Sequence, residues 1–337
     1  MKLTSDRDVA MCLQAYTDSA ALGAAMELGL FWLLAERPLA VADVALRLGI
    51  PPVRCGYWLQ LLEGMGLLDP APRGYALSGL ARSGIVDRYS QSTWAYLAEG
   101  EREQYRAACD LARHIQEPGP IEPAQGQTTS STFEKLVHSP DRARRFTTML
   151  YEVHQALAAQ LADHLDMTGV GRMMDLGGNS GVVSLALLRR VPGLTSVVVD
   201  TENVCFAGRE IVAENGAADR ISYYPADFTR DELPGGFDLV LQCDVGVYRR
   251  EVYQKLWTAL NPGGRLVIVD HLAAVEDVAT PALLYWAFLD SLADPGYRLV
   301  TAGQVRSWLE AAGFHLLVEE TLPGGRLMMQ ARKCQGL

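Results

Sequence analysis

One glycine-rich segment holds most of the residues that the sequence groups together for chemistry. Asp175 ends an apolar run, and Gly177, Gly178 and Gly181 follow it before an apolar helix that is expected over 182–190. Glycine lets the backbone turn sharply and approach a ligand closely, and the start of the helix presents free N–H groups. The segment therefore predicts a binding site for a nucleotide-like ligand.

The spacing of the glycines excludes two common kinds of nucleotide site. The dinucleotide motif Gly-x-Gly-x-x-Gly needs later glycines where this sequence has Asn179 and Val182, or Ser180 and Val183. A phosphate-binding loop ends in Gly-Lys-Ser/Thr, and no lysine lies near this turn. A turn that is led by a carboxylate and has no cation suits a ligand with hydroxyls and an ammonium group but no phosphate. S-adenosylmethionine is such a ligand, although the turn alone also fits a tight connection between a strand and a helix.

The turn resembles the first motif of class I methyltransferases, Asp/Glu-x-Gly-x-Gly-x-Gly. Here the motif consists of Asp175, Gly177, Asn179 and Gly181, with Gly178 at a variable position. Asn179 replaces the usual middle glycine, but asparagine tolerates left-handed backbone angles better than most residues. The resemblance implies that S-adenosylmethionine is the cofactor, that S-adenosylhomocysteine is its product, and that Asp175 and the three glycines contact it.

Acids at the ends of later strands support this cofactor. A second apolar strand ends at Asp200, 25 residues after Asp175, where an open α/β sheet places the acid that accepts hydrogen bonds from ribose hydroxyls. Asp227-Phe228, after a third strand, matches the family's adenine site, with the carboxylate on the exocyclic amine and the ring beside the base. We also expect Gln242, after a fourth strand, to contact the cofactor. A single acid at a strand end can be a solvated cap, but three in order at these spacings favour the cofactor.

Short apolar segments that alternate with helices must position these residues. Strands are expected at 173–176, 196–199, 221–224, 237–241 and 265–270. Together with the motif, this pattern predicts an α/β fold, a Rossmann-like class I methyltransferase sheet over residues 166–337. The resemblance implies that the sheet is mostly parallel with an antiparallel last strand.

The N-terminal part of the chain is a separate unit by pattern. Helices are expected at 9–34, 41–48 and 53–65, and a hairpin at 67–77. Three helices and a β wing form a winged-helix pattern, whose common function is DNA binding. The third helix, however, carries only Arg54 and Glu63 as charged residues. We therefore expect this helix to bury itself and the unit to contact protein.

An N-terminal winged-helix pattern followed by a C-terminal methyltransferase pattern resembles the small-molecule O-methyltransferases of plants and of bacterial natural-product pathways. The resemblance covers nearly the whole chain. The resemblance implies that residues 1–87 form an intertwined homodimer and that residues 88–165 are a helical linker lining the substrate pocket, with a polar break at 117–129. The catalytic domain then spans residues 166–337. The expected substrate contacts are Met149, Tyr151, Tyr248 and Trp286.

The main departure from this family lies after the fourth strand. The family carries a segment close to Lys-His-x-Leu-His-Asp-Trp, whose second histidine takes the proton from the acceptor hydroxyl. The corresponding segment here is 242–248, and Gly246 occupies the position of that histidine. Because glycine cannot accept a proton, the family's general base is missing at this position.

Three accounts of the chemistry follow from this departure. In the first, Asp244, His154 or His271 takes the proton, if it lies within hydrogen-bond reach. Each of these residues also has a purely structural interpretation: Asp244 as a hydrogen-bond partner of a helix start, His154 as a packing residue and His271 as the cap of a strand. In the second account the acceptor atom is a carbanion-like carbon, an enolate or an amine, and correct placement carries the rate. In the third, the fold performs non-methylating chemistry with S-adenosylmethionine as an electrostatic or structural cofactor.

A further candidate lies on a segment expected over 280–292, which faces the substrate in the family. It carries Trp286, and aromatic side chains are expected near a sulfonium whose charge is dispersed during transfer. It also carries Asp290, which could bind an amine or an acidic N–H.

Composition bounds the partners and the compartment. The formal net charge of −10 argues against a nucleic-acid surface. No apolar run approaches the ~20 residues of a membrane span, and the N-terminal residues lack the apolar segment of a signal peptide. The six cysteines show no Cys-x-x-Cys pairing, and there is no His-x-x-x-His motif. We therefore expect a cytoplasmic protein that binds no nucleic acid, membrane or metal.

The sequence thus predicts a homodimeric S-adenosylmethionine-dependent methyltransferase. Its expected acceptor is a small aromatic or amino-acid-derived metabolite, methylated on carbon or nitrogen, or on oxygen without the histidine base. Two alternatives stay open: a non-methylating enzyme on the same fold, and a winged-helix regulator that senses S-adenosylmethionine.

Overall fold

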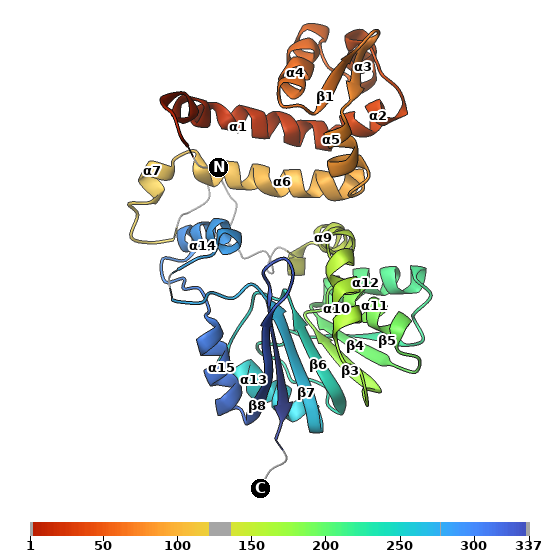
Figure 1. Ribbon diagram of the computed structural model, residues 1–337, viewed down its shortest axis with the longest axis vertical. Helices are drawn as coiled ribbons and strands as arrows, with labels where there is room; N and C mark the ends of the chain where they lie inside the picture. The colour runs from red at the N-terminus through yellow and green to blue at the C-terminus, as the bar shows by residue number, and fades with distance from the viewer. Residues whose placement is uncertain (1–2, 121–135, 277, 335–337) are drawn as a thin grey trace. The chain divides into compact units, whose positions relative to one another are not determined.

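The computed structural model describes residues 3–120, 136–276 and 278–334. The chain divides into two compact units, Met1–Asp110 and Leu111–Leu337 (Figure 1). The linker expected over 88–165 is shared between them, because its first helix packs along a helix of the N-terminal unit. The polar break expected at 117–129 lies largely outside the described residues.

The first unit is helical with one hairpin. Its elements are α1 (Asp6–Glu27), α2 (Leu30–Glu36), α3 (Val41–Leu48), α4 (Pro52–Gly64), β1 (Leu68–Ala71), β2 (Gly74–Leu77), α5 (Gly79–Ala81), the π-helical turn η1 (Arg82–Val86) and α6 (Gln91–Ala108). The single helix expected over 9–34 is wrong, because Gly29 adopts a left-handed φ of 74° and separates α1 from α2. The other two helices and the hairpin are confirmed.

The wing is anchored to the helices by its turn. Leu39 pairs with Tyr75 as an isolated bridge, and a Cβ at Gly74 would lie 2.1 Å from the Leu39 carbonyl oxygen. Only glycine therefore allows this approach. The third helix of the pattern, α4, buries Leu59 and Leu62 completely, as the sequence predicted.

The second unit is an α/β domain. Its elements are α7 (Leu111–His114), α9 (Pro140–Val153), α10 (Gln155–His164), β3 (Arg172–Leu176), α11 (Val182–Arg190), β4 (Thr195–Asp200), α12 (Glu202–Glu214), β5 (Ile221–Pro225), β6 (Phe237–Cys243), α13 (Arg250–Ala259), β7 (Leu260–Asp270), α14 (Pro281–Ala293), α15 (Ala302–Ala311), β8 (Phe314–Thr321) and β9 (Leu327–Lys333). The seven strands are ordered β5-β4-β3-β6-β7-β9-β8. Pairing is parallel except at β9, which is antiparallel to both of its neighbours. The predicted fold class, including the antiparallel last strand, is confirmed.

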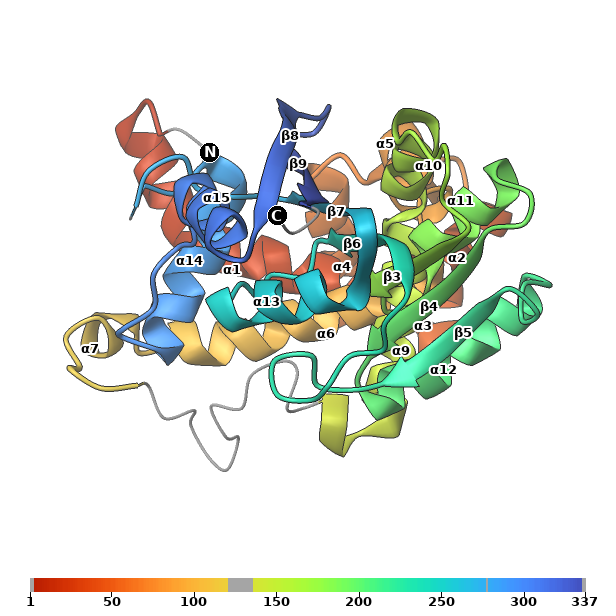
Figure 2. The same cartoon turned by 90° about the horizontal axis from the view of Figure 1, so that it is seen from below.

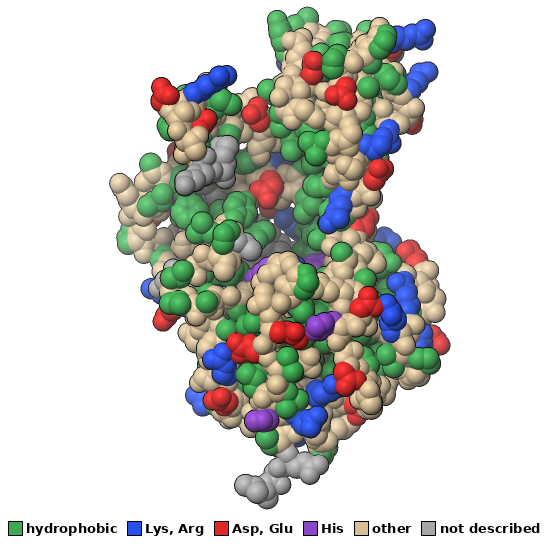
Figure 3. All heavy atoms as spheres, in the orientation of Figure 1, with side chains coloured by type: hydrophobic (Ala, Val, Ile, Leu, Met, Phe, Trp, Pro, Cys, Tyr) green, Lys and Arg blue, Asp and Glu red, His purple; other side chains and the backbone are tan. Residues whose placement is uncertain are grey.

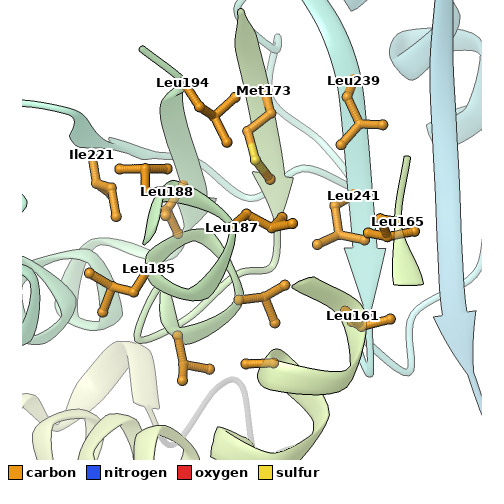
Figure 4. Close-up of a cluster of buried hydrophobic side chains, with 14 of the residues drawn as sticks. Leu161, Leu165, Met173, Leu185, Leu187, Leu188, Leu194, Ile221, Leu239 and Leu241 are labelled. Atoms are coloured by element: carbon orange, nitrogen blue, oxygen red, sulfur yellow. The ribbon is translucent and has the colours of Figure 1, made fainter. Parts of the chain in front are cut away.

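Helices cover both faces of this sheet (Figure 2). Side chains alternate across each strand, so Met173 of β3 joins one apolar cluster, shared with α10, α11 and α12, while Met174 joins the other, shared with α13 and α15. Figure 4 shows the first cluster, where Leu185, Leu187 and Leu188 of α11 pack onto the strands. The two cores hold the strands rigidly and thereby fix where their ends lie.

The direction of the strands determines at which edge of the sheet the functional residues lie. In a parallel sheet all strands end at one edge, and ligands bind outside that edge. Because β9 runs antiparallel and Leu327 pairs with Asp270 at the end of β7, the turn between β8 and β9 lies at the same edge (Figure 1). Acidic and basic side chains are interspersed over the visible face of this unit (Figure 3).

Among the described residues, no single helix has the length and apolar composition needed to cross a membrane. The helices α1 and α2 reach them only when taken together, across a bend of 61°.

Candidate active site

Asp175 lies beneath the glycine turn. Strand alternation places it on the α11 face of β3, where it accepts a hydrogen bond of 2.6 Å from Ser184 Oγ on α11. Ser184 Oγ also lies 2.8 Å from Ser196 Oγ of β4. Burial raises the pKa of the Asp175 carboxyl to about 6, although the Ser184 hydrogen bonds oppose this. The carboxylate therefore ties the turn to the first turn of the helix that follows it.

The turn itself requires its glycines. Gly177, Asn179 and Gly181 all have left-handed φ values, of 65°, 48° and 72°, which confirms the expectation for Asn179. A Cβ on Gly177 would lie 3.0 Å from the Val245 side chain. A Cβ on Gly178 would lie 2.4 Å from Asp175 Cγ. The turn is thus packed against the carboxylate below it and against the loop after β6.

Asp200 ends the neighbouring strand and faces the same turn. Its carboxylate accepts N–H hydrogen bonds from Asn179, at 3.1 Å, and from Thr201, at 2.7 Å. Burial raises the pKa of Asp200 to about 6, and the nearby Asp175 charge adds to the shift, although both hydrogen bonds oppose it. The carboxylate has further lone pairs that can accept hydrogen bonds from a ligand.

Several buried polar atoms around the turn have no hydrogen-bond partner among the described residues. They are Asn179 Oδ1, Ser180 Oγ, Thr201 Oγ1 and Gln242 Oε1. Buried polar atoms are nearly always paired, so this group indicates where a ligand binds. Asn179 Oδ1 and Gln242 Oε1 are acceptors, whereas the Ser180 and Thr201 hydroxyls can either accept or donate. All four can accept hydrogen bonds from S-adenosylmethionine, whose hydroxyls and ammonium group supply donors. Asp175, Asp200 and the glycines are the residues that could hold it.

The remaining expected cofactor contacts lie at the same edge. Asp227 follows β5, and its carboxylate accepts hydrogen bonds from the Thr229 N–H and hydroxyl, at 3.0 and 2.6 Å. These bonds lower the pKa of Asp227 against the opposing effect of burial. Phe228 is buried in the cluster that α13 covers. Gln242 donates from Nε2 to the Val247 carbonyl at 3.1 Å, which holds the loop after β6 closed.

Asp244 begins that loop and forms an ion pair. It has a left-handed φ of 49°, and its carboxylate accepts hydrogen bonds from Arg326 Nε, at 2.8 and 2.9 Å, and Nη2, at 2.8 Å. His154 Nε2 lies 3.1 Å from the same carboxylate. Burial alone would raise the pKa of Asp244, but the hydrogen bonds from His154 and Arg326 and the Arg326 charge hold it below its ordinary value. The carboxylate is therefore a weak base.

His154 has both ring nitrogens engaged. Nδ1 lies 3.1 Å from the Leu150 carbonyl oxygen, and Nε2 faces the Asp244 carboxylate. Both partners are oxygen acceptors, so each ring nitrogen is turned toward a protein oxygen. His154 is therefore engaged by the protein at both nitrogens.

Gly246 lies beside a second acid, Asp270. Its N–H donates to Asp270 Oδ2 at 3.2 Å, and the Tyr248 hydroxyl donates to the same oxygen. The His271 N–H donates to Oδ1 at 2.7 Å. Burial raises the pKa of Asp270, and burial followed by the Asp270 charge raises that of Tyr248 well above its ordinary value. Tyr248 is therefore a neutral donor that fixes the loop, and a Cβ on Gly246 would meet open space.

The structure brings together some of the expected catalytic residues but not all. Asp244 and His154 are in contact, and His271 follows Asp270 directly at the same edge. Asp290 lies instead on α14, where its carboxylate accepts a hydrogen bond from the Tyr297 hydroxyl, and burial raises its pKa.

The expected substrate contacts lie in different surroundings. Tyr248 is at the strand edge, as described, whereas Met149 is buried within α9. Tyr151 donates from its hydroxyl to Asn215 Oδ1 at 3.0 Å, and so ties α9 to the end of α12. Trp286 is 57% exposed on α14.

The sequence did not point to Arg326, Asp270 or Ser184 as site residues. The turn Leu322-Pro323-Gly324-Gly325 could have placed Arg326 near the start of a strand. Nothing in the spacing relates it to Asp244, 82 positions earlier. Within residues 3–120, 136–276 and 278–334, no group of three His, Cys, Asp or Glu side chains is arranged to hold a metal ion.

Two protein-family models match the chain. Residues 109–315 match an O-methyltransferase domain, and residues 11–87 match an O-methyltransferase dimerisation domain. Together these matches span both of the expected parts of the molecule.

Characterised relatives act at different atoms. A 3-hydroxy-5-methyl-1-naphthoate 3-O-methyltransferase of Streptomyces sahachiroi is 28% identical over 87% of this chain and 84% of its own. The N,N-dimethyltransferase OxyT of Streptomyces rimosus is 28% identical over 78% of each chain. An L-tyrosine C(3)-methyltransferase of Streptomyces lavendulae is 22% identical over 87% of this chain and 82% of its own.

Solved structures share the fold. The mitomycin 7-O-methyltransferase MmcR superposes with a TM-score of 0.82 over 98% of both chains, at 23% identity. The similarity covers both units.

Proposed function

The chain belongs to the O-methyltransferase family, and we propose that it transfers the methyl group of S-adenosylmethionine to a small aromatic or amino-acid-derived metabolite of natural-product biosynthesis. Relatives that methylate oxygen, nitrogen and carbon support this class of acceptor. The cofactor is S-adenosylmethionine, which leaves as S-adenosylhomocysteine.

One observation carries the proposal: acceptors that no described donor satisfies lie around the glycine turn. The Asp200 carboxylate has spare lone pairs, and the amide oxygens Asn179 Oδ1 and Gln242 Oε1 are buried without partners among the described residues. The cofactor supplies an electrophilic methyl group on a positively charged sulfur. We assign Asp200 to its ribose hydroxyls, and Asp175 to holding the turn in the shape that admits it.

The residues near Gly246 support a mechanism without a dedicated base. Asp244 is paired with Arg326, His154 has both nitrogens engaged, and Tyr248 is a donor to Asp270. None of these groups is ready to remove a proton. We therefore propose that the acceptor atom is already nucleophilic, as an amine, an ionised oxygen or a carbon activated by a ring hydroxyl, and that orientation carries the rate. His271 is the remaining candidate base, because its side chain makes no hydrogen bond among the described residues.

A second candidate function is a non-methylating reaction on the same fold. It is favoured only by Gly246, which leaves open space where the family has its catalytic histidine. In that case Asp200 and the turn would still bind the cofactor, and the acceptor would change without receiving a methyl group.

We also propose a homodimer formed by the first unit. The match of residues 11–87 to a dimerisation domain supports it, as do the exposed apolar side chains of Met11, Leu13 and Tyr16 on α1, which are 57%, 77% and 71% exposed.

The cofactor assignment is tested by calorimetry. S-adenosylmethionine and S-adenosylhomocysteine should bind the wild-type protein, and Asp200→Asn should bind both about 10-fold or more weakly, because a charged acceptor for the hydroxyls is lost. Asp163→Asn, on α10, is the control and should leave binding unchanged. Asp231→Asn is unsuitable as a control, because the exposed Asp231 carboxylate accepts a hydrogen bond from the Asp227 N–H. No binding of either compound to the wild-type protein would contradict the proposal.

A further inference from the structure

We propose that Arg326 is an anion-binding subsite for the acceptor, where it contacts a carboxylate or an ionised hydroxyl. The inference rests on the proposed function, because it concerns the second substrate of that site. It narrows the acceptor class from aromatic metabolites in general to those that carry an anionic oxygen.

Arg326 is held in one orientation by Asp244. The contacts from Nε and Nη2 to the carboxylate are 2.8 to 2.9 Å long. This side-on pairing fixes the plane of the guanidinium. His154 contacts the same carboxylate at 3.1 Å, so Asp244 itself is restrained from α9 as well. An arginine that is already ordered loses little side-chain entropy when it binds a ligand.

The pairing leaves three of the five guanidinium N–H donors free of protein partners among the described residues. Arginine has five N–H donors, and Asp244 engages only Nε and one hydrogen of Nη2. Nη1 and the second Nη2 hydrogen make no hydrogen bond among the described residues, and they form the end-on edge that suits a carboxylate. Nη1 lies beside the β8–β9 turn, 3.9 Å from the position of a Cβ built on Gly324. The side chain as a whole is 25% exposed.

Asp244 balances the charge of Arg326, and the N–H groups that it leaves free are the donors that remain for a ligand. The Asp244 carboxylate also lies 3.1 Å from His154 Nε2. The other nearby acid is Asp270, which accepts hydrogen bonds from the Tyr248 hydroxyl and the Gly246 and His271 N–H groups. Both carboxylates are therefore already engaged by protein donors.

The location of Arg326 suits a contact to the acceptor. It directly precedes Leu327, which pairs with Asp270 at the end of β7. Asp244 is followed by Val245, whose side chain lies 3.0 Å from the position that a Cβ on Gly177 would take. The arginine is thus linked through two residues to the turn that holds the cofactor, and it lies on the same edge as the open space at Gly246.

The test compares matched aromatic probes on protein saturated with S-adenosylhomocysteine. The probes are 2-naphthoate, 2-naphthamide and 2-naphthol, measured by calorimetry. The wild-type protein should bind one anionic probe about 10- to 100-fold more tightly than its neutral counterpart, as expected for a charge-assisted hydrogen bond. A preference for naphthoate over naphthamide identifies a carboxylate. A naphthol affinity that increases as the pH approaches the ionisation of its hydroxyl identifies an ionised hydroxyl.

Variants separate recognition from a purely structural role. Arg326→Gln should abolish the preference for the anion and leave the affinity for S-adenosylhomocysteine unchanged, and Arg326→Lys should keep part of the preference. Arg306→Gln is the matched control, because Arg306 also pairs side-on with a carboxylate, that of Glu319, between α15 and β8. This control should keep the full preference.

Three results would overturn the inference. They are equal binding of charged and neutral probes to the wild-type protein, an equal loss of all probes in Arg326→Gln, and no binding of any probe to protein that does bind S-adenosylhomocysteine. Failure of S-adenosylhomocysteine to bind the wild-type protein would instead contradict the proposed function.

Discussion

At the scale of single residues, the glycine turn explains how a short motif makes a ligand site. Gly177 and Gly181 are required by their left-handed backbone, and Gly177 also by its contact with Val245. Asp175 and Asp200 are buried beside them with raised pKa values. Ordinary side chains at the turn would fill the space or strain the backbone, so the residue types follow from the geometry.

Gly177→Ala should weaken cofactor binding about 10-fold or more and destabilise the protein by about 1–2 kcal/mol. The added Cβ would be strained at a φ of 65° and would lie 3.0 Å from Val245. Gly216→Ala is the matched control, because Gly216 has a φ of 66° with nothing within 4 Å of its Cβ. Calorimetry with S-adenosylhomocysteine should show weaker binding for the first variant only, while thermal unfolding should show a loss for both. Equal cofactor binding by the two variants would mean that the contact with Val245 does not shape the site.

Cofactor affinity should depend on the ionisation of Asp200. The pKa of this buried acid is raised to about 6 in the free protein, and ribose hydroxyls donate preferentially to the ionised form. Binding therefore favours loss of the proton: affinity should be full above about pH 6 and fall about tenfold per pH unit below it. Calorimetry from pH 5 to 8 measures this slope.

Two variants identify the group responsible. Asp200→Asn should bind weakly with little pH dependence. Asp175→Asn should show the same fall of cofactor affinity with decreasing pH, but the fall should begin at a slightly lower pH. The reason is that the Asp175 charge contributes to the raised pKa of Asp200. A pH-independent affinity in the wild-type protein would contradict the assignment.

At the scale of elements, the sequence predicted the strand ends at the binding edge of the sheet but not the pairing of Asp244 with Arg326. Apolar runs that end in Asp175, Asp200 and Asp270 locate strand ends from local sequence alone, since parallel strands end together. The pairing of Asp244 with Arg326 depends on β9 returning antiparallel beside β7. Local sequence does not specify which residues such a return brings together.

The same reasoning explains the error near Gly29. The apolar periodicity continues across this residue, so one helix was expected, but its left-handed φ ends α1 and redirects the chain into α2. Helical periodicity records which residues are buried, and it is insensitive to a bend that keeps both pieces against the same core.

The loop after β6 should depend on the Tyr248 hydroxyl. Tyr248→Phe removes a donor from buried Asp270, which keeps the N–H groups of Gly246 and His271. An incompletely satisfied buried carboxylate should lower the stability by about 1–3 kcal/mol, measured by chemical denaturation. Tyr57→Phe, on the exposed face of α4, is the control and should change it by less than about 0.5 kcal/mol. Equal stabilities of the two variants would show that the hydroxyl is not needed.

At the scale of the whole molecule, the chain joins a dimerisation domain to a methyltransferase domain. The sequence predicted both, because each has its own pattern: helices with a hairpin in one, and alternating strands and helices in the other. The acceptor could not be predicted in the same way, since pocket residues come from distant parts of the chain.

The homodimer should depend on the exposed apolar side chains of α1. The double variant Leu13→Glu with Tyr16→Glu places charges where both residues are exposed, so light scattering should show a shift from twice the chain mass toward the monomer. Leu317→Glu, on β8 of the second unit, should leave the dimer intact. A monomeric wild-type protein would contradict the proposal outright.

We propose that the protein transfers a methyl group without a histidine at position 246. This is tested by incubating the enzyme with S-adenosylmethionine labelled with ¹³C in the methyl group and with a panel of hydroxynaphthoates, aminonaphthoates and aromatic amino acids. Mass spectrometry should find the label on one acceptor class, with an equal amount of S-adenosylhomocysteine released. An acceptor that is converted while the label stays on S-adenosylmethionine would contradict the account and identify a non-methylating enzyme.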